Sequence, residues 1–482
     1  MLIKLADGNM MPVEMHKARM VQKINLVPAE ERYKAIKEAG YNTFLLRNRH
    51  IFIDGLTDSG VNAMSDNQYA ALLTTDDSYA GSETFYEFQA AVKDVLGYNF
   101  VMNVHQGRAA EHLICKIFGK PDGVIITNYH FTTTKAHIEE TAKSVCLELY
   151  ADEAVKTNSS HPFKGNMDIQ RLNDAVKKYG KDKIGYIRME ASTNLLGGQP
   201  FSMENFKEVK KVCTQNGILF VLDGSLLTEN AYLITQREKG YENKTVAEVV
   251  KELCSLPDIY YMSSRKNTCV RGGCIATNNE KLFRMFEPWL PLFEGFFTYG
   301  GMSMREVGAM AVGMREMCDI GTASAPVDQI AYFINKLDKM GIPVVTPPGA
   351  LGGHIDAKRF IPHLPKEQYI AGSLAAAFFI ISGVRTMERG TISMDRDKEG
   401  NDVYAELELM RVALPRRVYS IAHVEYIIDR LNWLYKHREL VGGLKFVSEP
   451  PVLRFFLGRL DSVGDWGRKL CDAFKKDFGD KA

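Results

Sequence analysis

The sequence predicts an α/β fold with a mainly parallel sheet and a second, smaller α+β domain. Three observations lead to this prediction. Apolar, β-rich runs recur between residues 100 and 276, amphipathic stretches lie between most of them, and the alternation stops after residue 322. Strands that alternate with helices need crossover connections, which are typical of parallel sheets. The 482 residues are enough for two to three domains, or for one large α/β domain plus a smaller one.

The first 57 residues predict an arm, a short helix over 29–39 and two strands. Seven apolar runs then predict strands at residues 100–104, 123–127, 144–149, 184–189, 218–222, 259–262 and 274–276. The stretches 108–118 and 203–216 have the apolar spacing of amphipathic helices. We therefore expect residues 58–322 to form the large domain, which would hold the functional site.

Beyond residue 322 the pattern predicts helices over 326–340, 371–383 and 421–435, strands from 343 and over 404–414, and a loop at 349–353. Residues 323–482 would form the small domain, together with part of residues 1–57. The tail from residue 458 onward is predicted to be a short amphipathic extension.

Charge and composition exclude several classes of protein. Sixty Lys and Arg residues against 59 Asp and Glu give a net charge of +1, so nucleic acid and acidic membranes are not expected partners. The longest apolar stretch, 371–384, is too short to span a bilayer, and the N-terminus lacks the apolar run of a signal peptide. We expect a soluble, cytoplasmic protein.

The eight cysteines are scattered, with no CxxC pair and no spacing typical of a zinc site. Buried free thiols in a reducing compartment, and no metal site, are therefore expected.

The segment 217–225 places Asp223 at the end of an apolar strand. Ligands of open α/β sheets bind at the carboxyl ends of strands. A single acid at this point more often caps the next helix, and for Asp223 alone that alternative stays open.

The next strand, 259–262, runs into Ser263, Ser264, Arg265 and Lys266. An Asp and a Lys at two adjacent strand ends match what pyridoxal phosphate (PLP) requires. The acid keeps the pyridine nitrogen protonated, and the lysine amine bonds to the aldehyde. A Ser-x-x-Lys pattern also occurs in serine hydrolases, but there a helix carries it, whereas here the lysine follows a strand.

Two further loops suit the same cofactor. His105-Gln106-Gly107-Arg108 follows a strand and opens a helix, which makes it a candidate phosphate site. Phe131 follows the strand 123–127, where an aromatic ring could stack on a cofactor; ordinary core packing is the alternative.

Longer motifs extend this pattern over residues 33–459. They are AGYNTFLL (39–46), LTDSGVNAMSD (56–66), YAGSETFY (79–86), HQGR (105–108), FTTT (131–134), NLLGGQP (194–200), ENAY (229–232), YGG (299–301), GVRTMERG (383–390), LPRRVY (414–419) and LRFF (453–456). The chain resembles the β-eliminating lyases of the tryptophanase and tyrosine phenol-lyase family, nearer to the latter. The resemblance implies the PLP-dependent fold type I. It also implies a carbon–carbon lyase that converts tyrosine to phenol, pyruvate and ammonia, assembled as a homotetramer from dimers that share active sites.

The resemblance also implies residue roles. Lys266 would bind PLP and shuttle the α-proton, Asp223 would pair with the pyridine nitrogen, and Phe131 would stack on the ring. The remaining cofactor contacts would be Asn194 at the ring hydroxyl and Gln106, Gly107, Arg108, Ser263 and Arg265 near the phosphate. The substrate contacts would be Arg416 at the carboxylate, with Thr57 and Ser59 nearby, Thr132 and Arg389 at the phenolic hydroxyl, and Met387 and Phe455 around the ring. Tyr79 of a neighbouring subunit would protonate the leaving group.

Some of these side chains have other interpretations. Arg389 could instead pair with Glu388 or another acid. Arg416 and Arg417 are adjacent and would point to different faces of an extended segment, so only one can bind the carboxylate. His105 and His137 are interpreted as structural histidines.

The chain departs from the family pattern at three places. Leu226 stands where an Arg normally neighbours the ring hydroxyl, and Arg265 replaces a Lys. The loop after Lys266 is one residue shorter, so that Arg271 falls at an expected cation ligand, with Asp77 in place of a Glu. Potassium is therefore a doubtful cofactor. From Leu226 we also hypothesise that tyrosine is not the best substrate.

Two alternatives accompany the lyase prediction. One is a PLP enzyme of the same fold that acts on another aromatic or β-substituted amino acid, which Leu226 favours. The other is a noncatalytic paralogue, against which the retention of Lys266, Asp223, Tyr79 and Arg416 argues.

Overall fold

The computed structural model describes residues 1–479, which divide into two compact units. The sheet unit comprises Ser59–Ala154 and His161–Val327. The C-terminal unit comprises Met1–Asp58, Val155–Ser160 and the chain from Asp328 onward. Each unit has its own apolar core and is described by itself.

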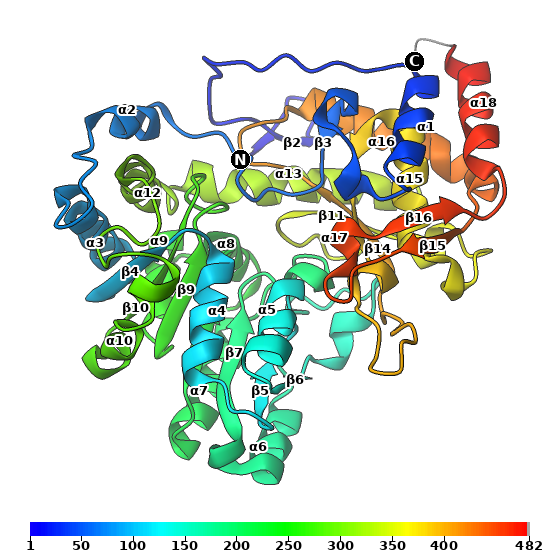
Figure 1. The fold of residues 1–482 in the computed structure, drawn as a ribbon. Coiled ribbons are helices and arrows are strands. Elements are labelled where there is room, and N and C mark those ends of the chain that lie inside the picture. The colour runs from blue at the N-terminus through cyan, green and yellow to red at the C-terminus, as the bar shows by residue number, and fades with distance from the viewer. Residues whose placement is uncertain (480–482) are drawn as a thin grey trace. The chain divides into compact units, whose positions relative to one another are not determined.

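The sheet unit is built on a seven-stranded sheet with the order β4-β10-β9-β8-β7-β5-β6 (Figure 1). Only β10 runs antiparallel to its neighbours, so the sheet is mainly parallel, as predicted. The strands are β4 (Phe100–Val104), β5 (Val124–Thr127), β6 (Val145–Glu148), β7 (Ile184–Glu190), β8 (Phe220–Asp223), β9 (Ile259–Ser263) and β10 (Gly273–Thr277). All seven predicted strands are confirmed, with bounds that shift by at most two residues.

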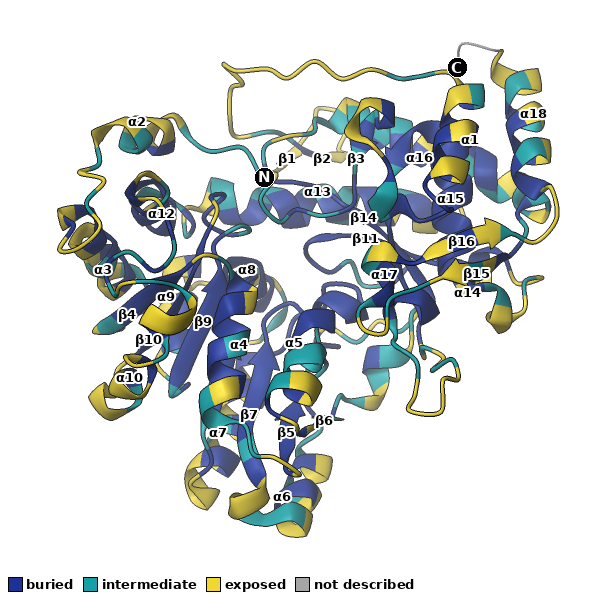
Figure 2. Ribbon diagram, viewed as in Figure 1, coloured by how far each residue is buried: buried dark blue, intermediate teal, exposed yellow. Residues whose placement is uncertain are grey.

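Helices cover both faces of this sheet. Successive residues of a strand point to opposite faces, so each strand contributes apolar side chains to a core on either side. In β5, Val124 and Ile126 enter one core while Ile125 enters another. Strands buried on both faces are accordingly dark blue in Figure 2, whereas the outer sides of the helices are exposed. The helices are α2 (Asp66–Thr74), α3 (Glu83–Leu96), α4 (Gly107–Phe118), α5 (Thr132–Ala136), α6 (Ile169–Lys183), α7 (Met203–Asn216), α8 (Leu227–Arg237), α9 (Val246–Cys254), α10 (Glu280–Phe286), α11 (Leu290–Phe293) and α12 (Met304–Glu316).

The C-terminal unit contains a three-stranded antiparallel sheet with the order β11-β14-β13, formed by Gly352–Asp356, Leu409–Ala413 and Met387–Arg389. Three further strand pairs join β1 (Leu2–Lys4) to β2 (Met10–Pro12), β3 (Ile53–Asp54) to β12 (Val384–Arg385), and β15 (Leu444–Ser448) to β16 (Arg459–Ser462). The longer helices are α1 (Ala29–Glu38), α15 (Ile370–Ser382), α16 (Ile421–Lys436) and α18 (Trp466–Phe478), together with α13 (Ile320–Lys339), whose residues up to Val327 are counted with the sheet unit; α14 (Ala357–Phe360) and α17 (Arg454–Leu457) are single turns.

Helix α15 is buried along its whole length, which confirms that the longest apolar stretch is a core helix. None of the helices in residues 1–479 combines the length and the apolar character needed to cross a membrane. The eight cysteines are free, and six of them are buried. The predicted extension from residue 458 forms β16 and α18; its last three residues lie outside the described part of the chain.

Three sequence predictions for the chain after residue 319 are wrong in detail. Helix α13 begins at Ile320 rather than at 326, so Pro326 lies inside the helix instead of opening it. Val344 makes only one bridge, to Ile355, so no strand opens at 343. Strand β14 begins at Leu409 rather than at 404. Just before it, the side-chain carboxylate of Glu408 accepts hydrogen bonds from the backbone N–H groups of Thr391 and Ala371.

Candidate active site

The predicted cofactor residues of the sheet unit lie at or just after the carboxyl ends of its parallel strands. Gln106, Gly107 and Arg108 follow β4, and Phe131 and Thr132 follow β5. Asn194 follows β7, Asp223 ends β8, and Ser263, Arg265 and Lys266 end or follow β9. Carboxyl ends of parallel strands meet at one edge of a sheet, so these residues gather from five segments of the chain.

Lys266 lies near two members of this group, Phe131 and Asp223. Its Nζ is 5.6 Å from the centroid of the Phe131 ring, and its side chain is half-buried. Asn62 holds the turn by donating hydrogen bonds to the backbone carbonyls of Arg265 and Lys266. Burial opposes ionisation of the Asp223 carboxyl, but the cationic groups of Arg188 and Lys266 hold its pKa below the usual range.

The turn into α4 lies directly against Ser263. A Cβ on Gly107 would come within 2.8 Å of Ser263 Cβ, so only glycine fits there. Gln106 forms a single bridge with Gly272, which ties the turn to β10. The start of this twelve-residue helix, next to a serine, is the kind of helix N-terminus that suits a phosphate group.

Three arginines add positive charge to this region. Burial, together with the nearby guanidinium groups of Arg271 and Arg108, lowers the pKa of Arg265. Arg265 Nε is buried and has no hydrogen-bond partner within residues 1–479. An anion here would relieve the repulsion among the three guanidinium groups and would accept a hydrogen bond from Arg265 Nε. The residues present therefore fit the phosphate of PLP.

Sequence reasoning missed a buried network behind Asp223, which we call the Arg188 network: Arg188, Glu190, Asp223 and Tyr261. Arg188 is 1 % exposed and donates to Asp223 Oδ2 across 2.6 Å and to Glu190 Oε2 across 3.1 Å. Tyr261 donates to the same Asp223 oxygen across 2.9 Å. The available signal was the pair of charged residues two positions apart in an otherwise apolar strand.

Asn194 and Leu226 lie near this network in the chain. The backbone N–H of Asn194 donates to Glu190 Oε1 across 3.0 Å. Leu226 is 2 % exposed and immediately precedes α8. The apolar residue is therefore part of the core, and the buried guanidinium beside Asp223 belongs to Arg188, on β7.

Tyr79 and Ser59 also belong to the sheet unit. Tyr79 is 62 % exposed, and its ring packs against those of Tyr299 and Phe296. Ser59 is half-buried, and the following Gly60 donates its N–H to the Arg265 carbonyl. Asp77, which replaces the glutamate of the family's cation site, lies 3.6 Å from Arg305 in an exposed ion pair.

Five predicted substrate residues lie in the C-terminal unit instead: Thr57, Met387, Arg389, Arg416 and Phe455. Arg416 is buried and donates to Asp58 Oδ2 across 2.7 Å, while Arg417 is half-buried with a φ of 63°. The two arginines thus differ in burial, but they lie in a turn and not in the extended segment for which opposite faces were predicted. Thr57, next to Asp58, is half-buried.

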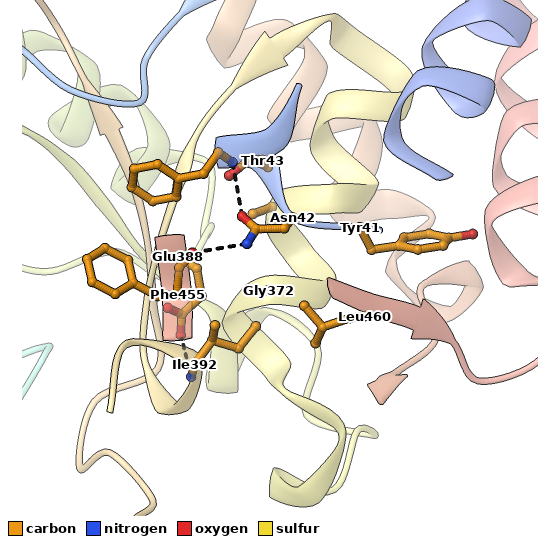
Figure 3. Close-up of a pocket in the computed structure, with 10 residues that line it drawn as sticks. Tyr41, Asn42, Thr43, Gly372, Glu388, Ile392, Phe455 and Leu460 are labelled. Carbon is orange, nitrogen blue, oxygen red and sulfur yellow. Dashed lines mark hydrogen bonds between the residues drawn. The ribbon is translucent and has the colours of Figure 1, made fainter. Parts of the chain in front are cut away.

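Arg389 lies over the face of the Phe455 ring, with the guanidinium carbon 5.8 Å from the centroid. Met387 lies two residues earlier on the same strand; its sulfur contacts Nη2 of buried Arg411 at 3.0 Å. Beside Phe455 is a small pocket into which Asn42 and Glu388 also point (Figure 3). Burial, and the nearby carboxyl of Glu408, raise the pKa of Glu388 to about 7.

His105 and His137, interpreted from the sequence as structural histidines, each lie next to a polar side chain. His105 Nδ1 lies 2.6 Å from Glu294, and His137 Nδ1 lies 3.2 Å from Thr141 Oγ1. Burial and the nearby His112 lower the pKa of His137 to about 4. Within residues 1–479, no cluster of His, Cys, Asp and Glu side chains is arranged to hold a metal ion.

Comparison with known proteins identifies the family. The model of the β-eliminating lyase family matches residues 54–430. The chain is 42% identical to the tyrosine phenol-lyase of Symbiobacterium thermophilum over 93% of this chain and 98% of that protein. It is 41% identical to the tyrosine phenol-lyase of Pasteurella multocida, with the same coverage.

The fold is shared more widely. A serine palmitoyltransferase from S. paucimobilis, solved with a bound PLP-myriocin aldimine, superposes with a TM-score of 0.55 at 12% identity, covering 81% of this chain and 89% of that one. The architecture is therefore that of PLP-dependent fold type I, and PLP is the cofactor that the family uses. With its sheet, its strand-end lysine and aspartate, and a family match over most of its length, the chain belongs to the β-eliminating lyases.

Proposed function

We propose that this PLP-dependent lyase cleaves the side chain of tyrosine to give phenol, pyruvate and ammonia. The observation that carries the proposal is the gathering of Lys266, Asp223 and Phe131 at the strand ends of one sheet. The 42% identity to a tyrosine phenol-lyase along nearly the whole chain supports the choice of substrate. We further propose a cytoplasmic homotetramer whose neighbouring subunits share active sites.

Lys266 would hold the cofactor covalently, with Asp223 at the pyridine nitrogen and Phe131 against the ring. Asn194 would contact the ring hydroxyl. The phosphate would be held by Gln106, Gly107, Arg108, Ser263 and Arg265. Bound PLP withdraws electrons from the substrate Cα, which makes its proton acidic.

Substrate orientation would come from the C-terminal unit. Arg416 would bind the α-carboxylate while Asp58 fixes the orientation of the guanidinium, with Thr57 and Ser59 nearby. Met387 and Phe455 would line the pocket for the aromatic ring. Arg389, held over the Phe455 ring, would contact the phenolic hydroxyl together with Thr132.

Two proton transfers remain for side chains of the protein. The Lys266 amine, once released from the cofactor, would take the proton from Cα. Tyr79 of a neighbouring subunit would donate a proton to the leaving phenol carbon. Its 62 % exposure within a single chain leaves the side chain accessible to a second subunit.

A second candidate keeps the fold and the cofactor but changes the substrate to another aromatic or β-substituted amino acid. Leu226 favours it, because an apolar side chain occupies the position where the family pattern has a cation. Under this alternative tyrosine would be a poor substrate, and another β-substituted amino acid would release pyruvate faster.

The test is a substrate panel with the purified holoenzyme. Tyrosine, tryptophan, S-substituted cysteines and β-chloroalanine are incubated separately, and pyruvate and ammonia are measured. The proposal predicts the highest kcat/KM for tyrosine, with phenol and pyruvate in equal amounts. A higher kcat/KM for another panel member would favour the second candidate, and no pyruvate from any member would contradict both.

A further inference from the structure

The Arg188 network lies across three adjacent parallel strands at one level of the sheet. Glu190 on β7 pairs in register with Asp223 on β8, which in turn pairs with Tyr261 on β9. Arg188 lies two residues before Glu190, so both side chains point to the same face. The network is buried: its four members are between 1 % and 5 % exposed.

Every polar group of the Arg188 side chain has a partner in this network or beside it. Nη2 donates to Asp223 and Glu190, Nε donates to the Tyr261 hydroxyl across 2.8 Å, and Nη1 donates to Thr127 Oγ1 across 3.2 Å. Asp223 Oδ2 thus accepts from both Arg188 and Tyr261, while Oδ1 accepts from the backbone N–H of Ser225. The acid is held in one orientation before any cofactor binds.

The burial of Asp223 explains why its contact with the cationic Arg188 is important. Burying a carboxylate is costly unless a cation pairs with it, and a guanidinium stays protonated throughout the physiological range. A third acid, Glu111, lies in the same part of the core, where Thr133 and Thr134 donate to its carboxylate and burial raises its pKa. Arg188 is thus the permanent cation among several buried acids.

When an acid and a pyridine nitrogen share one proton in a buried site, the proton can lie in either of two places. The proton lies either on the nitrogen, giving an ion pair, or on the acid, giving a neutral pair. A low-dielectric environment favours the neutral pair. A cation hydrogen-bonded to the carboxylate opposes this, because it lowers the affinity of the carboxylate for the proton.

We propose that Arg188 is a positioning residue that holds Asp223 as a carboxylate and so keeps the shared proton on the pyridine nitrogen of bound PLP. The inference rests on the proposed placement of that nitrogen at Asp223. Glu190 competes for the same Nη2 group, so it weakens the effect of Arg188 on Asp223. The network tunes the cofactor through Asp223 and does not touch the substrate.

The experiment uses PLP labelled with ¹⁵N in the ring and the full-length holoenzyme. The ¹⁵N chemical shift reports whether the ring nitrogen is protonated, and the dissociation constant of PLP is measured separately by titration of the apoenzyme. Four variants are compared with the natural chain: R188M, the charge-balanced R188M/E190Q, E190Q alone, and D223A. The double variant keeps the test valid if R188M, with two unpaired buried acids, does not fold.

The natural enzyme and E190Q are expected to show the shift of a protonated nitrogen. R188M/E190Q is expected to move more than half of the way toward the unprotonated shift, while PLP remains bound. A protonated shift retained in R188M/E190Q, or an unprotonated shift in the natural enzyme, would overturn the inference. D223A separates this from the proposed cofactor placement, because an unchanged shift in D223A would show that the nitrogen does not lie at Asp223.

Discussion

Arg416 and Asp58 form a buried ion pair, in which Arg416 Nη1 donates to Asp58 Oδ2 across 2.7 Å. The pair fixes the orientation of the guanidinium, whose planar fork matches the geometry of a substrate carboxylate. Asp58 immediately follows Thr57, so the segment that holds the arginine also carries a proposed substrate contact.

Replacing Arg416 tests this arrangement. Because hydrogen bonds to charged groups contribute about 1.5–3 kcal/mol, R416A is expected to lower kcat/KM for amino acid substrates by roughly 10- to 150-fold. Half-buried Arg417 is the control, and R417A should retain most of the activity. Equal losses in the two variants would contradict a carboxylate-binding role for Arg416. Thermal unfolding of both would show how much of the loss reflects stability.

The second prediction concerns Tyr79. If its hydroxyl protonates the leaving group, Y79F should lower kcat for tyrosine by roughly 10²- to 10⁴-fold, the usual range for a general acid. Elimination from β-chloroalanine, whose leaving group needs no proton, should change little. Y86F is a matched control, since Tyr86 is also an exposed tyrosine of the sheet unit. Similar losses with both substrates would indicate a structural role for Tyr79.

The third prediction concerns Glu388, beside the Phe455 pocket. Burial and Glu408 raise its pKa from 4.5 to about 7, so between these values only the folded state binds the proton. The free energy of unfolding should therefore decrease as pH rises through this range. In E388Q this contribution is absent. Urea unfolding at pH 5 and pH 8 should show a smaller loss for E388Q than for the natural chain, and identical losses would contradict the assignment.

The fourth prediction concerns monovalent cations. Arg265 and Arg271 add charge beside the cofactor loop, and Asp77 pairs with Arg305 on the surface. A potassium ion is therefore expected to stabilise the cofactor loop only slightly. PLP affinity and kcat should differ less than twofold between potassium and tetramethylammonium buffers of equal ionic strength. A tenfold or greater activation by potassium would show that a cation site persists.

The sequence predicted the strand ends well, because apolar β-rich runs and the motifs after them are local patterns. Asp223 and Lys266 were found because each follows such a run. Arg188 and Glu190 were missed because they lie inside an apolar strand, whose other residues indicated only a buried core element. Their role depends on Asp223 and Tyr261, which are paired with them only through the register of the folded sheet.

Errors in the C-terminal unit have a similar origin. The segment at 343 has β-rich composition, but only Val344 finds a partner, at Ile355. Residues 404–408 were assigned to a strand, but the pairing of β14 with β11 begins only at Leu409. The carboxylate of Glu408 accepts from the backbone of Ala371 and Thr391, which composition does not reveal. Long-range polar contacts of this kind need the fold before they can be recognised.

The central claim is that Lys266 carries the cofactor, and borohydride reduction of the purified holoenzyme tests it most directly. Reduction should fix the cofactor to the protein, and peptide mass mapping should place the pyridoxyl group on the peptide containing Lys266. K266A should bind PLP without this covalent product. A protein that holds no reducible PLP, or that carries the label on another lysine, would contradict the account.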